Sequence, residues 1–207
     1  MLQIVLQDVG KQFQQKWVFR GLNLQLEASG RYALVGRNGS GKSTLLKTLS
    51  AYLSPSRGKI SWTLKGNALA PEQVYRQLSI AAPYLELIEE FSLKEMVLFH
   101  RQFSPLPDTL STEEIIELSE LTGNSGKQIR HFSSGMKQRV KLLRAILPDT
   151  PLLLLDEPCT NLDRQGRQWY MSLLTGHARN KTIVVASNHN TEEYTGEFTL
   201  IHLGHKS

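Results

Sequence analysis

The stretch GRNGSGKST, residues 36–44, combines three glycines with a lysine and three hydroxyl side chains at fixed spacing. Glycines let the backbone curl so that its N–H groups point at phosphate oxygens. The Lys42 ammonium can reach the β- and γ-phosphates of a nucleotide, and the Ser43 hydroxyl can ligate Mg²⁺. The pattern G-x-x-x-x-G-K-S therefore predicts a P-loop that holds a nucleoside triphosphate.

The segments on either side of this loop must position it. RYALVG, residues 31–36, is short and apolar, which predicts a buried strand. Residues 43–53 carry leucines at helical spacing. Strand, glycine loop and helix form the context that a P-loop requires, and the helix adds the positive end of its dipole. The alternative, a glycine turn with an exposed lysine, would not need these neighbours.

A pair of carboxylates follows four leucines in LLLLDEP, residues 152–158. Such a run predicts a strand covered on both faces, as in a parallel sheet. Asp156 would then lie at the sheet edge where ligands bind, and could hold Mg²⁺ directly or through water. Glu157 could accept a proton from an attacking water molecule. The alternative is a pair of solvated acids after a strand.

Two further segments have to be interpreted together with these motifs. HFSSGMKQRVKLLRAIL, residues 131–147, reads alone as a serine-capped helix start. TIVVAS, residues 182–187, is a predicted buried strand, and His189 follows it at the ligand edge of the sheet.

Together, residues 36–44, FSSGMKQRV, LLLLDEP, TNLD at 160–163 and SNH at 187–189 resemble the ATP-binding cassette (ABC) ATPases in order and spacing. The resemblance covers essentially the whole chain. It implies an α/β fold: a P-loop NTPase core with a mostly parallel sheet, an N-terminal antiparallel β-subdomain and an inserted α-helical subdomain. Residues 1–207 would form one domain, with the core and β-subdomain in 1–83 and 149–207 and the helical subdomain in 84–148.

The resemblance also implies ATP and Mg²⁺ as cofactors and assigns residue roles. Catalytic roles fall to Glu157, His189 and Lys42, and metal ligation to Ser43 and Asp156. The nucleotide would contact Phe13, Gly36, Asn38, Gly39, Ser40, Gly41, Lys42, Ser43, Thr44, Ser133, Gly135 and Asp163.

Three of these assignments carry alternatives. Ser133 and Gly135 would touch the γ-phosphate bound by a second subunit, although the family's usual L-S-G-G-Q is altered here at Phe132, Ser134 and Met136. Asp163 is either a subunit-interface residue or a helix N-cap, and both readings can hold together. The adenine would stack on Phe13, with Trp17 as the alternative.

The largest departure from the family concerns the glutamine expected after Pro83, where this chain has Tyr84. That glutamine helps to hold Mg²⁺ and couples the nucleotide site to the membrane subunit. We expect coupling to survive, with the ligand replaced by the Tyr84 hydroxyl, the Glu86 carboxylate or water. The segment LELIEEFSLKEM, residues 85–96, would form the docking surface, or else a helix face buried internally.

Composition limits the partners. The chain is 40% hydrophobic with a net charge of +5 and one cysteine, Cys159, which excludes an intrachain disulfide. No long apolar run or signal-peptide pattern is present, so we expect a cytoplasmic location, peripheral at the inner face of the cell membrane. The expected partners are a transmembrane permease and a second ATPase subunit, in a homodimer or a heterodimer. Nucleic acid is not an expected partner, because no base-reading pattern accompanies the basic residues.

The predicted function is the ATP-binding and hydrolysing subunit of an ABC transporter, resembling the short bacterial exporter-like type. ATP-dependent dimer closure would drive a separate membrane subunit. The alternatives are a non-transport ABC ATPase that acts on nucleic acid or the ribosome, a small-molecule kinase, and a binding module without activity. The sequence identifies neither the cargo nor the direction of transport.

Overall fold

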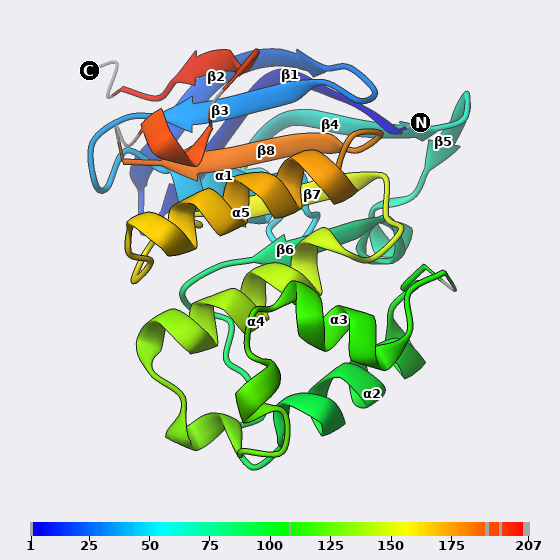
Figure 1. Cartoon of the computed structure of the whole chain (residues 1–207). Helices are drawn as coiled ribbons and strands as arrows, with labels where there is room; N and C mark the ends of the chain where they lie inside the picture. The colour runs from blue at the N-terminus through cyan, green and yellow to red at the C-terminus, as the bar shows by residue number, and fades with distance from the viewer. Residues whose placement is uncertain (1, 108, 189–190, 195, 205–207) are drawn as a thin grey trace.

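The computed structural model describes residues 2–107, 109–188, 191–194 and 196–204 (Figure 1). Four strands form an antiparallel sheet in the order β2-β1-β4-β5. They are β1 (Leu2–Phe13), β2 (Lys16–Leu26), β4 (Arg57–Leu64) and β5 (Asn67–Leu69). The alternation of apolar and polar residues in these segments fits a sheet with one covered face, as the sequence predicted.

A second sheet of five strands carries the P-loop. Its order is β6-β7-β8-β3-β9, and every neighbouring pair runs parallel. The strands are β6 (Leu78–Ala81), β7 (Leu152–Asp156), β8 (Thr182–Ser187), β3 (Arg31–Val35) and β9 (Thr199–His202). Because parallel strands share one carboxyl edge, the segments after β3, β7 and β8 meet there.

Helices connect and cover the sheets. The α-helices are α1 (Lys42–Leu49), α2 (Leu93–Phe103), α3 (Thr112–Leu118), α4 (Ser134–Ile146) and α5 (Arg164–His177). Short 3₁₀ helices are η1 (Pro71–Gln77), η2 (Thr122–Asn124), η3 (Ile129–His131) and η4 (Thr191–Glu193). The helix after the P-loop is shorter than the predicted 43–53, because Ala51 takes a left-handed φ of 59° that ends the helical path. None of the helices in the described part of the chain is long and apolar enough to cross a bilayer.

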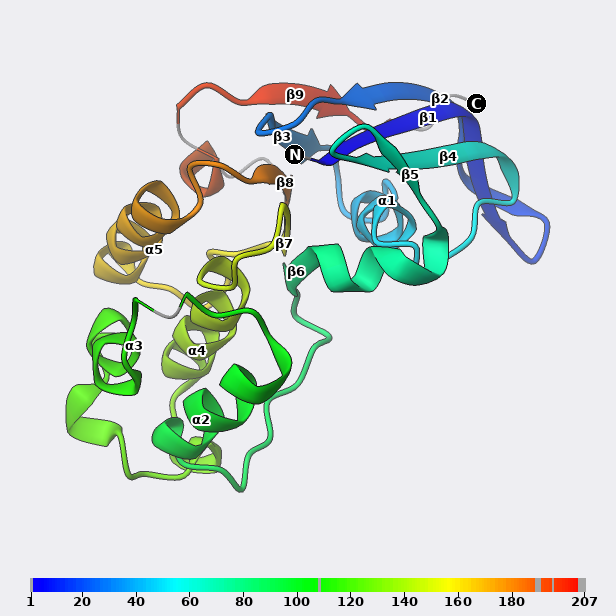
Figure 2. The same cartoon turned by 90° about the vertical axis from the view of Figure 1, so that its right-hand side faces the viewer.

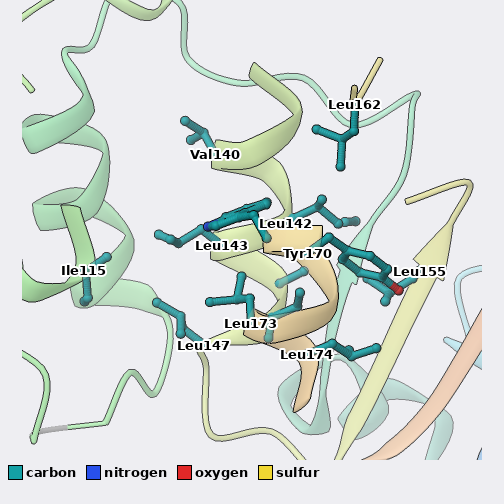
Figure 3. Close-up of a cluster of buried hydrophobic side chains, with 14 of the residues drawn as sticks. Ile115, Val140, Leu142, Leu143, Leu147, Leu155, Leu162, Tyr170, Leu173 and Leu174 are labelled. Atoms are coloured by element: carbon teal, nitrogen blue, oxygen red, sulfur yellow. The ribbon is translucent and has the colours of Figure 1, made fainter. Parts of the chain in front are cut away.

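The leucines of β7 supply two separate cores. Leu152 and Leu154 pack with α1 and the antiparallel sheet, whereas Leu153 and Leu155 pack with α4 and α5. Figure 3 shows Leu155 on the second side, near Leu142 and Tyr170. Side chains alternate along a strand, so a run of four leucines can serve both faces only in a sheet covered on both sides. This confirms the prediction drawn from LLLLDEP.

Helices α2, α3 and α4 lie together on the far side of the molecule from the antiparallel sheet (Figures 1 and 2). A serine N-cap begins each of the three, and two of the caps are capping boxes, formed by Ser92 and Glu95 at α2 and by Ser111 and Glu114 at α3. The predicted α/β fold class is confirmed, while the division of the chain at residues 84 and 148 stays a prediction.

Candidate functional site

The P-loop joins the end of β3 to the start of α1, and two of its glycines occupy crowded positions. A Cβ on Gly36 would lie 2.4 Å from the Leu203 carbonyl oxygen, and one on Gly41 would lie 2.6 Å from Val18 Cγ1. Gly41 also has a φ of 98°, and Gly39 a φ of 79°. Only glycine takes such angles without strain. The exposed tip of the loop, Arg37–Gly39, therefore curls back into the buried start of α1.

The Lys42 ammonium lies inside this loop. Lys42 is buried, and its Nζ donates to the Gly36 carbonyl at 2.7 Å and to the Arg37 carbonyl at 3.1 Å. No side chain caps the helix at Gly41, so the first N–H groups of α1 remain available at the positive end of its dipole. A cation and free N–H donors at one point form an anion site.

Ser40 gives a second sign that this loop suits a polar ligand. Its side chain is 7% exposed, and its Oγ has no hydrogen-bond partner among the residues that the structure describes. Buried hydroxyl groups are rarely left unpaired in folded proteins. A phosphate oxygen in the loop would supply a partner, so the residues present fit a bound nucleotide.

Asp156 and Ser43, the two predicted metal ligands, lie together. Asp156 is 4% exposed at the end of β7. Burial raises the pKa of its carboxyl, while a hydrogen bond from the Ser43 side chain and the nearby Lys42 charge lower it. A buried carboxylate beside a hydroxyl is a suitable donor pair for a hard cation such as Mg²⁺.

Glu157, the residue after Asp156, has a strained backbone conformation. Its φ is 47°, and its N–H donates to the Ala186 carbonyl of β8 at 2.9 Å. Left-handed angles at a residue other than glycine cluster at functional sites. The neighbouring charge of Glu157 contributes to the raised pKa of Asp156, so the two carboxylates lie within electrostatic range.

Sequence reasoning missed a third carboxylate in this region. Glu193, in η4, is 4% exposed and accepts from the Cys159 N–H at 3.2 Å. Burial raises the pKa of its carboxyl, and Ser187 lowers it through a side-chain hydrogen bond. An acidic pair in TEEY carries no pattern that would distinguish it from a solvated surface, so the sequence held no usable signal.

The predicted signature segment begins α4. Ser133 is the N-cap, and its Oγ accepts from the Met136 N–H at 3.2 Å. A Cβ on Gly135 would lie 2.9 Å from the Asn161 carbonyl oxygen. Gln138, also in α4, donates to the Pro158 carbonyl at 2.8 Å. The start of α4 is thus fastened to the loop that follows Glu157, although α4 itself lies apart from α1 in both views (Figures 1 and 2).

Asp163 caps α5. Its Oδ1 accepts from the Gly166 N–H at 2.7 Å. The N-cap reading is therefore confirmed, and the interface reading stays a prediction.

The two candidates for the adenine partner share one hollow. Phe13 and Trp17 line a cavity of about 440 Å³ that also touches Gly39 of the P-loop. Phe13 is 47% exposed, and the Lys11 ammonium lies 5.1 Å from its ring centroid. Both rings are positioned to meet a base whose phosphates occupy the loop, so the structure keeps both alternatives.

Tyr84 lies against α1, the helix that follows the P-loop. Its ring is 4.0 Å from the Lys47 ammonium of α1. Burial, with the charges of Asp156 and Tyr52 behind it, raises the pKa of the Tyr84 phenol to about 12. The tyrosine is therefore neutral at ordinary pH and lies near the predicted metal ligands. Its contact with Lys47 joins segments distant in sequence, which no local pattern revealed.

The structure also locates two other predicted nucleotide-binding residues. Asn38 is at the exposed tip of the P-loop, and the Thr44 carbonyl in α1 accepts from the Thr48 hydroxyl at 2.7 Å. The predicted catalytic histidine, His189, lies outside the described residues.

Comparison with known proteins agrees with this geometry. The family model for ABC transporters matches residues 19–160. The chain is 31% identical over 189 residues to the Nod factor export ATP-binding protein I of Burkholderia lata, covering 89% of this chain and 62% of that protein. It is 29% identical over 178 residues to the cytochrome c biogenesis ATP-binding export protein CcmA of Dechloromonas aromatica, covering 84% and 86%. The chain thus spans less than two thirds of the Nod factor protein's length.

Solved structures share the fold. An ATP-binding subunit of an ABC transporter superimposes with a TM-score of 0.78 at 26% identity, covering 97% of this chain and 86% of that chain. A dimeric bacterial ABC transporter cassette gives a TM-score of 0.78 at 22% identity, covering 97% and 94%. With the P-loop, the carboxylates after β7 and the family match in agreement, the chain belongs to the ABC transporter ATP-binding family.

Proposed function

We propose that this chain is the ATP-binding and hydrolysing subunit of an ABC exporter. The observation that carries the proposal is the meeting of Lys42, Ser43 and Asp156 at one sheet edge, with Glu157 next in sequence. An anion site beside buried carboxylates suits a nucleotide with its metal ion. Relatives named for export support the direction of transport.

Each residue of the site has a distinct role in this proposal. Lys42 and the first N–H groups of α1 hold the β- and γ-phosphates. Ser43 and Asp156 hold Mg²⁺, which neutralises phosphate charge when bound. Glu157 orients the attacking water and accepts its proton. His189 is assigned to the γ-phosphate from the sequence motif.

The site of one chain leaves the signature segment unused, which favours a two-chain arrangement. Ser133 and Gly135 lie at the start of α4, a helix apart from α1. We assign them to the nucleotide held by a second chain, in a homodimer or with a related ATPase. A γ-phosphate that both chains bind stabilises the closed dimer, and the dimer opens when hydrolysis removes that phosphate. Closure then drives a membrane permease, with the ATPase on the cytoplasmic face.

The state of association tests this proposal. Glu157→Gln removes the proton acceptor but keeps the side-chain shape. The variant should therefore still bind ATP, but hydrolyse it at least about a hundredfold more slowly. Sedimentation of the variant should show a dimer in saturating Mg-ATP and a monomer in Mg-ADP. A variant that stays monomeric in Mg-ATP, even beside its membrane partner, contradicts the two-chain scheme.

A further inference from the structure

One buried carboxylate contacts the turn that carries Glu157. The turn covers residues 157–160 and closes with a hydrogen bond from the Thr160 N–H to the Glu157 carbonyl at 3.1 Å. Within it, the Cys159 N–H donates to Glu193 Oε1 at 3.2 Å. Glu193 lies 34 residues further along the chain, in η4. The contact therefore depends on how η4 packs against the end of β7.

The backbone of this turn needs such support. The φ of 47° at Glu157 costs free energy, and it persists only where the surroundings fix it. The Glu157 N–H donates to the Ala186 carbonyl of β8 at 2.9 Å, and the Gln138 side chain of α4 donates to the Pro158 carbonyl at 2.8 Å. With the contact from Glu193, three successive residues of the turn are each held by a different element.

Glu193 is itself held on two sides. Its carboxylate is 4% exposed and accepts a hydrogen bond from the side chain of Ser187, at the end of β8. Its backbone carbonyl accepts from the Tyr170 hydroxyl at 3.0 Å. Tyr170 is fully buried in α5 and lies beside Leu155 of β7 (Figure 3). The carboxylate is therefore a fixed point against which the turn can be held.

Folding stability does not account for an acid at this position. Glu193 Oε2 is buried and has no hydrogen-bond partner in the part of the chain that the structure describes. A buried carboxyl group with one unpaired oxygen costs free energy that an apolar side chain would not. The charges of Glu157 and Asp156 add to the effect of burial in raising its pKa. Glu193 thus lies within electrostatic range of both site carboxylates.

We propose that Glu193 is a positioning residue for ATP hydrolysis, which binds the Cys159 N–H and so keeps the Glu157 carboxylate directed at the attacking water. The assignment rests on the proposed function, because Glu193 acts through the role given there to Glu157. Its oxygen is needed as a hydrogen-bond acceptor, and its charge is not. Glutamine keeps such an oxygen at the same reach, whereas alanine has none.

Steady-state ATP hydrolysis tests this role. Glu193→Ala should lower kcat by about thirtyfold, because a small displacement of a catalytic group costs up to about a hundredfold in rate. The KM for ATP should change by less than about twofold, since the P-loop is intact. Glu193→Gln should retain at least about half of the wild-type kcat, since it still accepts from the Cys159 N–H.

The preceding residue provides a matched control. Glu192 belongs to the same 3₁₀ turn, and its carboxylate lies 3.1 Å from Arg167 Nε in a partly exposed ion pair. Glu192→Ala removes a carboxylate from η4 without removing the contact to Cys159. Its kcat should remain within about twofold of the wild-type value.

A double variant separates positioning from a general loss of structure. In a Glu157→Gln background, Glu193→Ala should slow the residual hydrolysis by less than about twofold, because no proton acceptor is left to position. A merely structural role would lower the rate by the same factor in both backgrounds. A Glu157→Gln variant that hydrolyses ATP as fast as wild-type protein would instead contradict the proposed function, and with it the role of Glu193.

Amide hydrogen exchange tests the contact without ATP. By NMR, the Cys159 N–H should exchange about tenfold faster in Glu193→Ala than in wild-type protein, and within about threefold of wild type in Glu193→Gln. Unchanged kcat in Glu193→Ala, an equal loss of kcat in Glu193→Ala and Glu193→Gln, or an unchanged exchange rate overturns the proposal. If Glu193→Ala does not fold, Glu193→Asp replaces it in each measurement, because its shorter side chain draws the oxygens back from the Cys159 N–H.

Discussion

At the scale of single residues, the site consists of groups whose environment suits a triphosphate ligand. Lys42 is buried yet held by two carbonyl oxygens, and Ser40 has an unpaired buried hydroxyl. Asp156 is kept beside the Ser43 hydroxyl. These residues come from contiguous motifs, which is why the sequence alone predicted them.

Tyr84 is the residue whose role most needs a measurement. Tyr84→Phe keeps a ring over Lys47 but removes the hydroxyl that we expect near the metal ion. If that hydroxyl replaces the missing glutamine, the Mg²⁺ concentration for half-maximal ATP hydrolysis should rise by about tenfold, which corresponds to one lost polar contact. Glu86→Ala tests the other candidate in the same assay. An unchanged Mg²⁺ dependence in both variants would mean that water fills the position.

At the scale of elements, polar caps and buried ring nitrogens fix the helices that surround the site. Asp163 caps α5 through the Gly166 N–H. Asp163→Ala should therefore lower the free energy of unfolding by about 1 kcal/mol, whereas Asp163→Asn keeps a capping oxygen and most of the stability. Urea denaturation measures both.

The same pair distinguishes the two roles of Asp163. If Asp163→Asn retains stability but loses ATP hydrolysis, the carboxylate also acts at the subunit interface. Full activity in Asp163→Asn would leave the cap as its whole role.

His100 gives the contact between α2 and α4 a pH dependence. Its Nε2 lies 3.0 Å from the Arg144 carbonyl oxygen, and the Ser104 hydroxyl lies 3.2 Å from its Nδ1. Its pKa falls from 6.5 to about 4 on folding, so below pH 6.5 the unfolded chain takes up a proton that the folded chain does not. The stability that His100 contributes is thus complete above this window and is lost as pH falls from 6.5 towards 4.

Urea unfolding of wild-type protein and His100→Gln at several pH values checks this. The stability difference between them should narrow as the pH decreases. A difference that does not vary with pH would show that His100 is not the titrating group.

At the scale of the whole molecule, the sequence could not predict the contacts between residues that lie far apart in the chain. The P-loop and the buried strand before Asp156 followed from motif spacing and apolar runs, and the antiparallel subdomain followed from the family resemblance. A cavity of about 650 Å³ is lined both by Arg76 of η1 and by Arg144 of α4, and the Tyr84–Lys47 contact joins a loop to α1. Such contacts depend on how elements pack, and no spacing along the chain encodes them.

Mixing two inactive variants tests whether each site is built from two chains. Lys42→Ala disables the P-loop, and Ser133→Arg blocks the signature segment. In a mixed dimer both lesions fall in one site, and the other site is intact. Equimolar mixing should then restore about a quarter of wild-type ATP hydrolysis, since half the dimers are mixed and each has one good site of two. A mixture as inactive as its components would exclude this arrangement.

The strand β7 has a consequence of its own. Its successive leucines belong by turns to the core on each side of the sheet, so both cores share a single backbone segment. We therefore expect a ligand that rigidifies the P-loop side also to steady β7, which forms a wall of the helical side. The alternating side chains of this one strand thus connect the nucleotide site to the helices.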